Sequence, residues 1–216
     1  MPQPQRIEEE GWTFFDWLQA NSRAVTIGAA VVAVALLGGW FYVRSGELKR
    51  LNAERMLNQA KQSIAAGNAP LAQADLQRVA SRYKGTPSGV QAAMILAQIQ
   101  YDQGKFAEGI QTLDPFRSGS DDLQASVLSL IGDGQMASGQ GAEAAETYKE
   151  AAAATTLVGE KTVYRSKAAR ALMSAGKTAE ARTLWQELAD DPDAELVHAE
   201  ARIRLGELGV QTAGGN

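Results

Sequence analysis

The longest apolar run in the sequence lies near its start, from Val25 to Val43, and contains no charged residue. As an α-helix this run would be about 28 Å long, close to the thickness of the hydrocarbon core of a bilayer. Its last positions carry aromatic rings, which favour the interface between lipid and water: Trp40, Phe41 and Tyr42. The pattern therefore predicts a single transmembrane helix over residues 25–43.

Two other structures would also give an apolar run of this length. A buried core helix is disfavoured because the run is apolar on every face. A cleaved signal peptide is disfavoured because the preceding segment is long and acidic, with Glu8–Glu10 and Asp16, and no small-residue cleavage site follows. We therefore expect an uncleaved anchor. Small residues spaced four apart would permit close helix contact within it, at Ala29/Ala33 and Ala35/Gly39.

The segment before this run, within residues 1–24, is rich in aromatic side chains. Trp12, Phe15 and Leu18 fall near one face of a helix. This spacing predicts a short tail followed by an amphipathic juxtamembrane helix at the level of the lipid headgroups. The alternative is an aromatic belt that extends the anchor, and both interpretations place the segment on the membrane.

The charges on either side of the apolar run leave its orientation open. Arg6 and Arg23 precede it, whereas more cationic residues follow it: Arg44, Lys49, Arg50, Arg55 and Lys61. Read literally, the positive-inside rule places the C-terminal part in the cytoplasm. The rule is weaker for long domains, which cross the membrane largely regardless of charge. Both orientations therefore stay open on charge alone.

From residue 47 onward the hydrophobic pattern is helical and is interrupted by a recurring glycine. The four glycines are Gly67, Gly104, Gly139 and Gly176. Their spacing is close to the period of about 34 residues that tetratricopeptide helix-turn-helix units have. A glycine suits these positions because a helix often ends on a residue with positive φ.

Four further columns align when the sequence is numbered from these glycines. Small residues lie seven positions before each glycine and five after it, which would let two helices cross closely: Ala60, Ala97, Gly132 and Ala169, then Ala72, Gly109, Ala144 and Ala181. Large residues lie nine positions after each glycine: Leu76, Leu113, Tyr148 and Trp185. Apolar residues lie twelve positions after each glycine: Val79, Phe116, Ala151 and Leu188. Four columns in phase over four units predict an all-α solenoid.

The predicted repeat domain covers residues 47–208 and leaves a flexible tail at 209–216. It contains about four helix pairs and a capping helix at 194–208 that covers the apolar face of the last pair. The expected pairs are 47–66 with 69–83, 88–103 with 106–117, 122–138 with 141–154, and 161–175 with 178–190.

Composition supports this fold and excludes several functions. Alanine supplies much of the apolar content, which suits closely packed helices. The net charge of -4 argues against non-specific binding of nucleic acid. The chain has no cysteine, so a disulfide, a thiol nucleophile or a thiolate metal site is excluded.

The residues that could carry chemistry do not form a catalytic or metal-binding pattern. His198 is the only histidine and is expected to be a solvated surface residue. The carboxylates of Asp190, Asp191 and Asp193 surround a proline at a helix junction, where capping explains them better than a metal site. We therefore expect no enzyme activity, no cofactor and no metal.

Two stretches near the anchor, FFDWLQANSRAVTIG and GGWFYVRS, precede the alanine-rich repeats. Together they resemble the bacterial family of ancillary Sec-translocon subunits, which share a domain type with a cell-division coordinator. The resemblance covers nearly the whole chain and is most specific from Phe14 to Tyr42. It implies a single-pass inner-membrane protein with a cytoplasmic N-terminus and a periplasmic repeat domain. It also implies the translocation channel and periplasmic chaperones or emerging clients as partners, and no catalytic residues.

The leading functional hypothesis is a membrane-anchored adaptor that binds other proteins. The first helices of such pairs usually line the concave face of a solenoid, and four of their residues are candidate protein contacts: Gln98, Tyr101, Gln135 and Arg170. One alternative is a self-assembling module, for example a homodimer that binds no client. Another is a cytoplasmic scaffold tethered through anionic lipids by the basic residues between 44 and 61.

Overall fold

The structure is a computed structural model that describes residues 22–119 and 123–213. It divides into two compact units, residues 1–48 and 49–216. The predicted amphipathic helix around Trp12, Phe15 and Leu18 lies outside the described residues.

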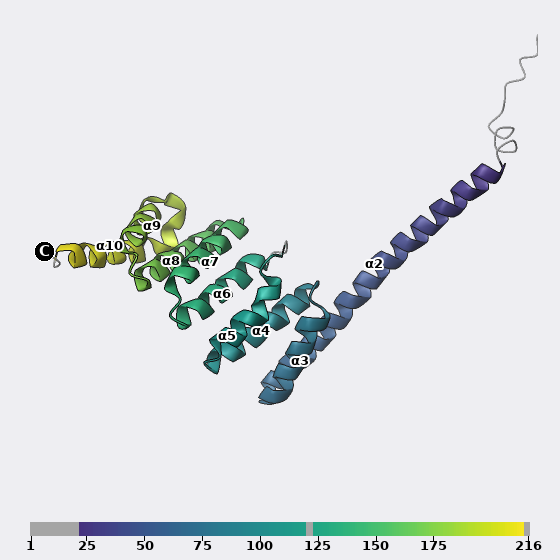
Figure 1. The fold of residues 1–216 in the computed structure, drawn as a ribbon, viewed down its shortest axis with the longest axis horizontal. Helices are drawn as coiled ribbons and strands as arrows, with labels where there is room; N and C mark the ends of the chain where they lie inside the picture. The colour runs from purple at the N-terminus through teal and green to yellow at the C-terminus, as the bar shows by residue number, and fades with distance from the viewer. Residues whose placement is uncertain (1–21, 120–122, 214–216) are drawn as a thin grey trace, which may run out of the picture. The chain divides into compact units, whose positions relative to one another are not determined.

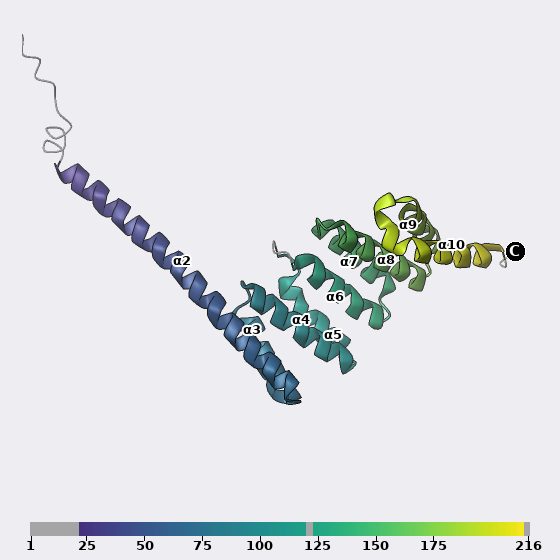
Figure 2. The same cartoon turned by 180° about the vertical axis from the view of Figure 1, so that it is seen from behind.

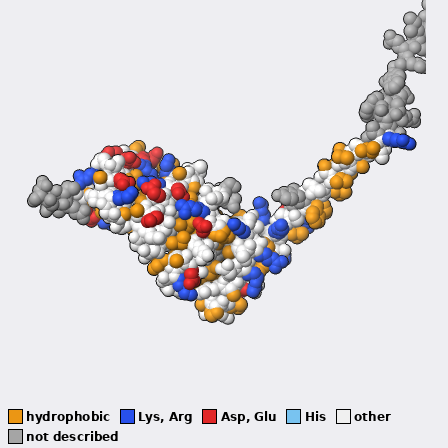
Figure 3. All heavy atoms as spheres, in the orientation of Figure 1, with side chains coloured by type: hydrophobic (Ala, Val, Ile, Leu, Met, Phe, Trp, Pro, Cys, Tyr) orange, Lys and Arg blue, Asp and Glu red, His pale blue; other side chains and the backbone are white. Residues whose placement is uncertain are grey.

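The described part of the first unit belongs to helix α2 (Ser22–Ala65). Large apolar side chains described in this part of the helix are exposed: Trp40 is 65% exposed and Phe41 69%, and hydrophobic atoms are prominent along it (Figure 3). By length and composition this helix could cross a membrane. The exposure argues against the buried core helix that the sequence left as an alternative.

The second unit is a stack of helix pairs, in which each helix lies beside the next one in the chain (Figures 1 and 2). After the last part of α2 its helices are α3 (Ala69–Arg82), α4 (Pro87–Asp102), α5 (Phe106–Leu113), α6 (Gln124–Ala137), α7 (Gly141–Ala154), α8 (Val158–Ser174), α9 (Thr178–Asp190) and α10 (His198–Ala213). The prediction of an all-α solenoid built from helix pairs is thus confirmed.

The four recurring glycines close the first helix of each pair. All have positive φ, between 72° and 77°. In each pair the residue after the glycine donates its N–H to the carbonyl five positions back, for example Lys105 to Gln100 at 2.8 Å and Lys177 to Leu172 at 2.9 Å. This is the Schellman motif, which satisfies carbonyls that a helix end would leave unpaired. The predicted role of these glycines is therefore confirmed.

The aligned columns form the interior of the stack. Every residue of the four columns is buried, and the largest side chain among them, Trp185, is fully buried. The small positions receive aromatic rings: Tyr101 lies against Gly109, and Tyr148 lies against Gly132. Glycine is needed at these two sites because the ring occupies the space that a Cβ atom would take.

Helix ends depart from the prediction where proline is present. α5 ends at Leu113 and the chain continues as a 3₁₀ turn, Asp114–Phe116, because Pro115 has no N–H to continue the α-helical bonding. The predicted single helix 194–208 is in fact a 3₁₀ segment, Pro192–Val197, followed by α10. α10 extends to Ala213, so residues 209–213 are helical rather than part of a flexible tail.

Candidate protein-binding surface

One column of polar residues lies along the first helices of the pairs, six positions before each glycine. It consists of Lys61, Gln98, Asp133 and Arg170. All four are exposed or half-buried, and each lies on the first helix of its own pair. The repeat thus places one polar side chain per unit on a shared face, the arrangement by which solenoids contact an extended partner.

In the third helix pair, the member of this column, Asp133, lies in a polar cluster. The carboxylate of Asp133 accepts hydrogen bonds from the Lys167 ammonium at 2.8 and 2.9 Å and from the Tyr148 hydroxyl at 2.7 Å. Lys167 also donates to the Ser129 hydroxyl at 3.0 Å and lies 5.4 Å from the centre of the Tyr148 ring. α6, α7 and α8 each contribute to this cluster, so it joins the third pair to the fourth.

The two tyrosines near this cluster hold their protons tightly. Burial raises the pKa of Tyr148 far above its usual value, and its hydrogen bond to Asp133 and that carboxylate's charge raise it further. Burial, followed by the charge of Asp133, likewise raises the pKa of Tyr101. Both hydroxyls therefore remain neutral hydrogen-bond donors throughout the physiological pH range.

Two of the predicted contact residues, Gln98 and Arg170, are exposed. The Gln98 amide donates to Asp102 at 2.9 Å on the same helix. Arg170 binds Glu200 of α10 through two nitrogens, Nε at 2.8 Å and an η nitrogen at 3.1 Å. Arg170 thus fastens the capping helix to α8 while one edge of its side chain stays accessible.

The other two predicted residues, Tyr101 and Gln135, are half-buried. The Tyr101 hydroxyl donates to the backbone carbonyl of Leu130 at 3.1 Å, and its ring lies against Gly109 and Gly134. Tyr101 therefore joins the second pair to the third. The side-chain oxygen of Gln135 is buried and accepts no hydrogen bond within the described part of the chain.

The structure adds Asp133 and Lys167 to the residues that the sequence singled out. Asp133 shares its column with Gln98 and Arg170, so counting six positions before each glycine would have found it. Lys167 has no such signal, because its bond to Asp133 joins residues 34 apart in sequence. Only the packing of α8 on α6 and α7 brings it there.

The residues considered for chemistry make structural contacts instead. His198 is half-buried rather than fully solvated, and its Nε2 lies 2.7 Å from the backbone oxygen of Asp191. The Asp191 side chain accepts from the Asp193 N–H at 3.0 Å and pairs with Arg165 at 3.1 Å, which fits the expected capping role. Over residues 22–119 and 123–213, no group of three His, Cys, Asp or Glu side chains could hold a metal ion.

Replacing Tyr148 by phenylalanine should cost about 1–2 kcal/mol of stability at neutral pH, because a hydrogen bond to a charged group is lost. It should also change the response to alkali. The folded wild type holds the Tyr148 proton more tightly than the unfolded chain, so this contribution to stability is full below about pH 10. It falls as the pH rises above about 10, where only the unfolded chain releases the proton.

Urea denaturation between about pH 7 and pH 11, monitored by circular dichroism, would measure both effects. The Tyr148→Phe variant should lose less stability than wild type over the alkaline half of this range. Equal losses in the two proteins would show that Tyr148 is not held in its neutral form by the fold.

Comparison with known proteins agrees with this geometry. A family described as a tetratricopeptide repeat-like domain matches residues 16–128 and 52–167, and a second, described as a tetratricopeptide repeat, matches residues 166–212. The first match begins before the apolar run and includes it. No curated protein matches the chain.

Two similar solved structures contain nearly identical TPR-like repeats of a Podosopora anserina protein assigned as a kinesin light chain. One, a variant with a single substitution, has 18% identity and a TM-score of 0.56, with 75% of this chain and 87% of that chain covered. The other has 16% identity and a TM-score of 0.51, with 75% and 97% covered. At these identities the likeness concerns the fold alone. Since each match to the first family spans more than half of the sequence, the chain belongs to the tetratricopeptide repeat-like domain family.

Proposed function

We propose that this chain is a membrane-anchored protein–protein interaction module, ancillary to the Sec translocon, that links the channel to periplasmic chaperones or emerging clients. The general role in binding other proteins rests on the fold, because tetratricopeptide repeat domains indicate protein–protein interaction modules. The observation that carries the anchored form is an uncharged, solvent-exposed helical segment directly preceding the repeats.

The anchor is argued from exposure as well as length. In the N-terminal part of α2, large apolar side chains are exposed, among them Ile27, Val34 and Leu37. Exposing so continuous an apolar surface to water is costly, and the cost disappears if residues 25–43 lie in lipid. Trp40 then lies where aromatic side chains favour the membrane interface.

The translocon role and the orientation rest on the resemblance between Phe14 and Tyr42. That resemblance implies an N-terminus in the cytoplasm and repeats in the periplasm of a bacterial inner membrane. The first helices of the pairs support a protein partner there: Gln98 and Arg170 of the polar column are exposed contacts, and Tyr101 and Gln135, outside that column, are half-buried ones. Ion pairs within the unit already hold Arg170 and Lys167, so the surface is ordered before a partner binds.

A cytoplasmic scaffold is the second candidate, because the residues after the apolar run are basic. Arg44, Lys49, Arg50, Arg55 and Lys61 are all exposed on α2. Each such charge near an anionic surface would add about 1 kcal/mol to membrane attachment. The cytoplasmic and periplasmic candidates differ in the compartment that holds the repeats.

Replacing residues 25–43 by an unrelated Leu/Ala span should preserve membrane insertion, which requires only hydrophobic length. It should remove shape-specific helix contacts, which contribute about 1–2 kcal/mol in membranes. Recovery of the translocation channel in mild detergent should therefore fall by roughly tenfold. Co-purification of the channel with the full-length protein and with the chimera measures this change.

Protease treatment of intact spheroplasts is the companion measurement, because it reports the compartment of the repeats. Digestion of the repeats supports the periplasmic orientation, and protection would establish the cytoplasmic scaffold instead. If the chimera recovers the channel as well as wild type does, the repeats carry the association. If neither protein recovers the channel, the translocon role is wrong.

A further inference from the structure

Positive charge is concentrated in the first helix pair of the second unit. Residues 49–84 contain seven Lys or Arg and two acidic residues, whereas residues 85–213 contain eleven Lys or Arg and eighteen acidic residues. Figure 3 shows Lys and Arg side chains gathered where α2 enters the repeats, and Asp and Glu side chains mainly over the later helices. The repeat stack is therefore basic at its start and acidic over the rest of its length.

Five of these cations lie at one end of the first pair. After the turn at Gly67, α3 runs back beside the last part of α2 (Figures 1 and 2). Residues equally far from Gly67 on either side of it therefore lie at the same level of the pair, as Arg50 and Lys84 do, each 17 positions away. This end of the pair, where α2 enters the repeats, carries five exposed cations that we call the basic end: Lys49, Arg50, Arg55, Arg82 and Lys84.

The charge of the basic end is not neutralised by the protein. None of its five side chains has an ion-pair partner within the described part of the chain. Arg82 and Lys84 each lie over an aromatic ring, which leaves their charge in place. Of the two acidic residues in 49–84, Asp75 is buried and bound to Arg78 at 3.1 Å, so only Glu54 is exposed.

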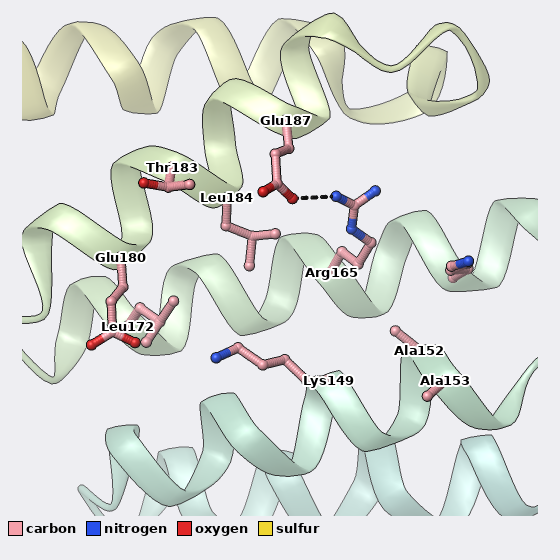
Figure 4. A pocket seen from close by; sticks show the side chains of 10 residues that line it. Lys149, Ala152, Ala153, Arg165, Leu172, Glu180, Thr183, Leu184 and Glu187 are labelled. Atoms are coloured by element: carbon pink, nitrogen blue, oxygen red, sulfur yellow. Dashed lines mark hydrogen bonds and ion pairs between the residues drawn. The ribbon is translucent and has the colours of Figure 1, made fainter.

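The cations of the later pairs are mostly held in ion pairs. A cleft of about 590 Å³ between α7, α8 and α9 gives an example, because Arg165 within it binds Glu187 at 2.7 Å (Figure 4). Lys161 and Arg202 are exposed and have no ion-pair partner among the described residues, but they lie on different helices, α8 and α10. A group of unneutralised cations therefore distinguishes the basic end from the later pairs.

The place of the basic end in the chain favours an anionic lipid surface as its partner. Lys49 and Arg55 follow Val43, the last residue of the apolar run, by 6 and 12 residues, which is about 9 and 18 Å along an α-helix. The headgroup layer adds about 5–7 Å to each side of the hydrocarbon core. The field of an anionic surface extends about one Debye length further, about 8–10 Å. The basic end is therefore within reach of the headgroups when residues 25–43 span a bilayer.

We propose that the basic end binds anionic phospholipid headgroups beside the anchor and so holds the first helix pair against the bilayer. The later pairs have an excess of acidic residues, so the same surface does not attract them and they remain in water. An acidic protein is the less favoured partner, because the anchor keeps lipid at a high effective concentration. The inference rests on the anchored form of the proposed function, but on neither the translocon role nor the compartment of the repeats.

Fluorescence quenching in vesicles tests this inference on the full-length protein. The chain has no cysteine, so Ser81→Cys, exposed on α3 beside Arg82, carries a single fluorophore. Lipids with spin-labelled headgroups quench the fluorophore when it lies close to the bilayer. Quenching should be several-fold greater in phosphatidylcholine vesicles that contain phosphatidylglycerol than in phosphatidylcholine alone. It should fall to the neutral-vesicle level when salt is raised from about 0.1 M to about 1 M, which shortens the Debye length to about 3 Å.

A charge variant and a matched control identify the residues responsible. Arg50→Gln with Lys84→Gln should lower the docking equilibrium on anionic vesicles by roughly thirtyfold. Lys161→Gln with Arg202→Gln removes the same charge from two other exposed, unpaired cations and should leave quenching unchanged. Because all four side chains are exposed, circular dichroism should show both variants folded.

Three results would overturn the proposal. Equal quenching of the wild type in anionic and neutral vesicles would show that the anchor alone sets the distance, and undiminished quenching in the basic-end variant would place the contact elsewhere. Loss of a co-purified acidic protein from that variant, without any dependence on lipid charge, would assign the basic end to a protein partner. Flotation with neutral vesicles tests the anchor separately. A protein that floats but shows no lipid dependence contradicts this inference alone, whereas one that does not float contradicts the anchored form as well.

Discussion

Replacing Trp185 by alanine should lower the free energy of unfolding of the repeat unit by roughly 3–5 kcal/mol. Trp185 is the largest fully buried side chain among the described residues. It lies within the core of the last two pairs, and its indole N–H points to the sulfur of Met173 at 3.2 Å. Truncation would leave a cavity between α8 and α9 that alanine-rich neighbours are too short to fill.

Urea denaturation of the full-length protein in mild detergent, monitored by circular dichroism, would measure this loss. Leu196→Ala is the matched control: Leu196 is large, apolar and exposed on the same end of the stack. Its truncation should change stability by less than about 0.5 kcal/mol. A loss below about 1 kcal/mol for Trp185→Ala would mean that the column of large residues does not hold the last pair together.

Replacing Gly132 by alanine should cost about 1–3 kcal/mol, although alanine is the better helix former. A Cβ atom at Gly132 would lie 2.6 to 2.9 Å from three atoms of the Tyr148 ring. The ring cannot move away without cost, because its hydroxyl is bonded to Asp133 and Lys167 lies over its face. The substitution therefore strains the polar cluster as well as the crossing of α6 and α7.

Gly159→Ala provides the control for helix propensity. Gly159 is in α8, and a Cβ atom there would meet nothing within 4 Å. Because Gly159 lies in the first turn of α8, this variant should be more stable than wild type by only a few tenths of a kcal/mol, up to about 0.5, in the same denaturation experiment. If both glycine variants gained stability, the close contact between Gly132 and Tyr148 would not exist in solution.

The candidate surface was only partly predictable. Gln98 and Arg170 share a column in the sequence, and the structure places both on exposed positions. Tyr101 follows on the same helix as Gln98, but its hydroxyl is bonded to Leu130 of the next pair. A single sequence gives the spacing of such a residue but not the rotation of its helix about the helix axis. It therefore could not show whether Tyr101 faces solvent or contacts the next repeat.

The residues that bind Asp133 in the polar cluster were likewise not predictable from the sequence. Asp133 could be found by its position before Gly139, but the two residues that bind its carboxylate, Tyr148 and Lys167, come from two other helices. The charge pattern gives no preference for these pairs over other acid–base pairs in the chain. The α7–α9 cleft is likewise built from three helices and has no signature along the sequence.

Local physical chemistry explains what the sequence determined. The glycines at Gly67, Gly104, Gly139 and Gly176 fixed the turns because positive φ is cheap only for glycine. The columns of small and large residues around them fixed the all-α repeat, and the uncharged run 25–43 fixed a helix long enough to cross a bilayer. Each of these signals lies within a short stretch of chain, so a single sequence contains it in full.

Tertiary structure decided the features that depend on the distance between helices. Pro192 marked a helix boundary, but the predicted helix 106–117 ran through Pro115, and neither the 3₁₀ geometry of the two proline segments nor the extension of α10 to Ala213 was predicted. The joining of Asp133 to Lys167, the α7–α9 cleft and the basic end of the first pair exist only once the helices are stacked. Side-chain contacts between repeats depend on helix rotation and crossing, and these are set by the packing of the whole core rather than by any one segment.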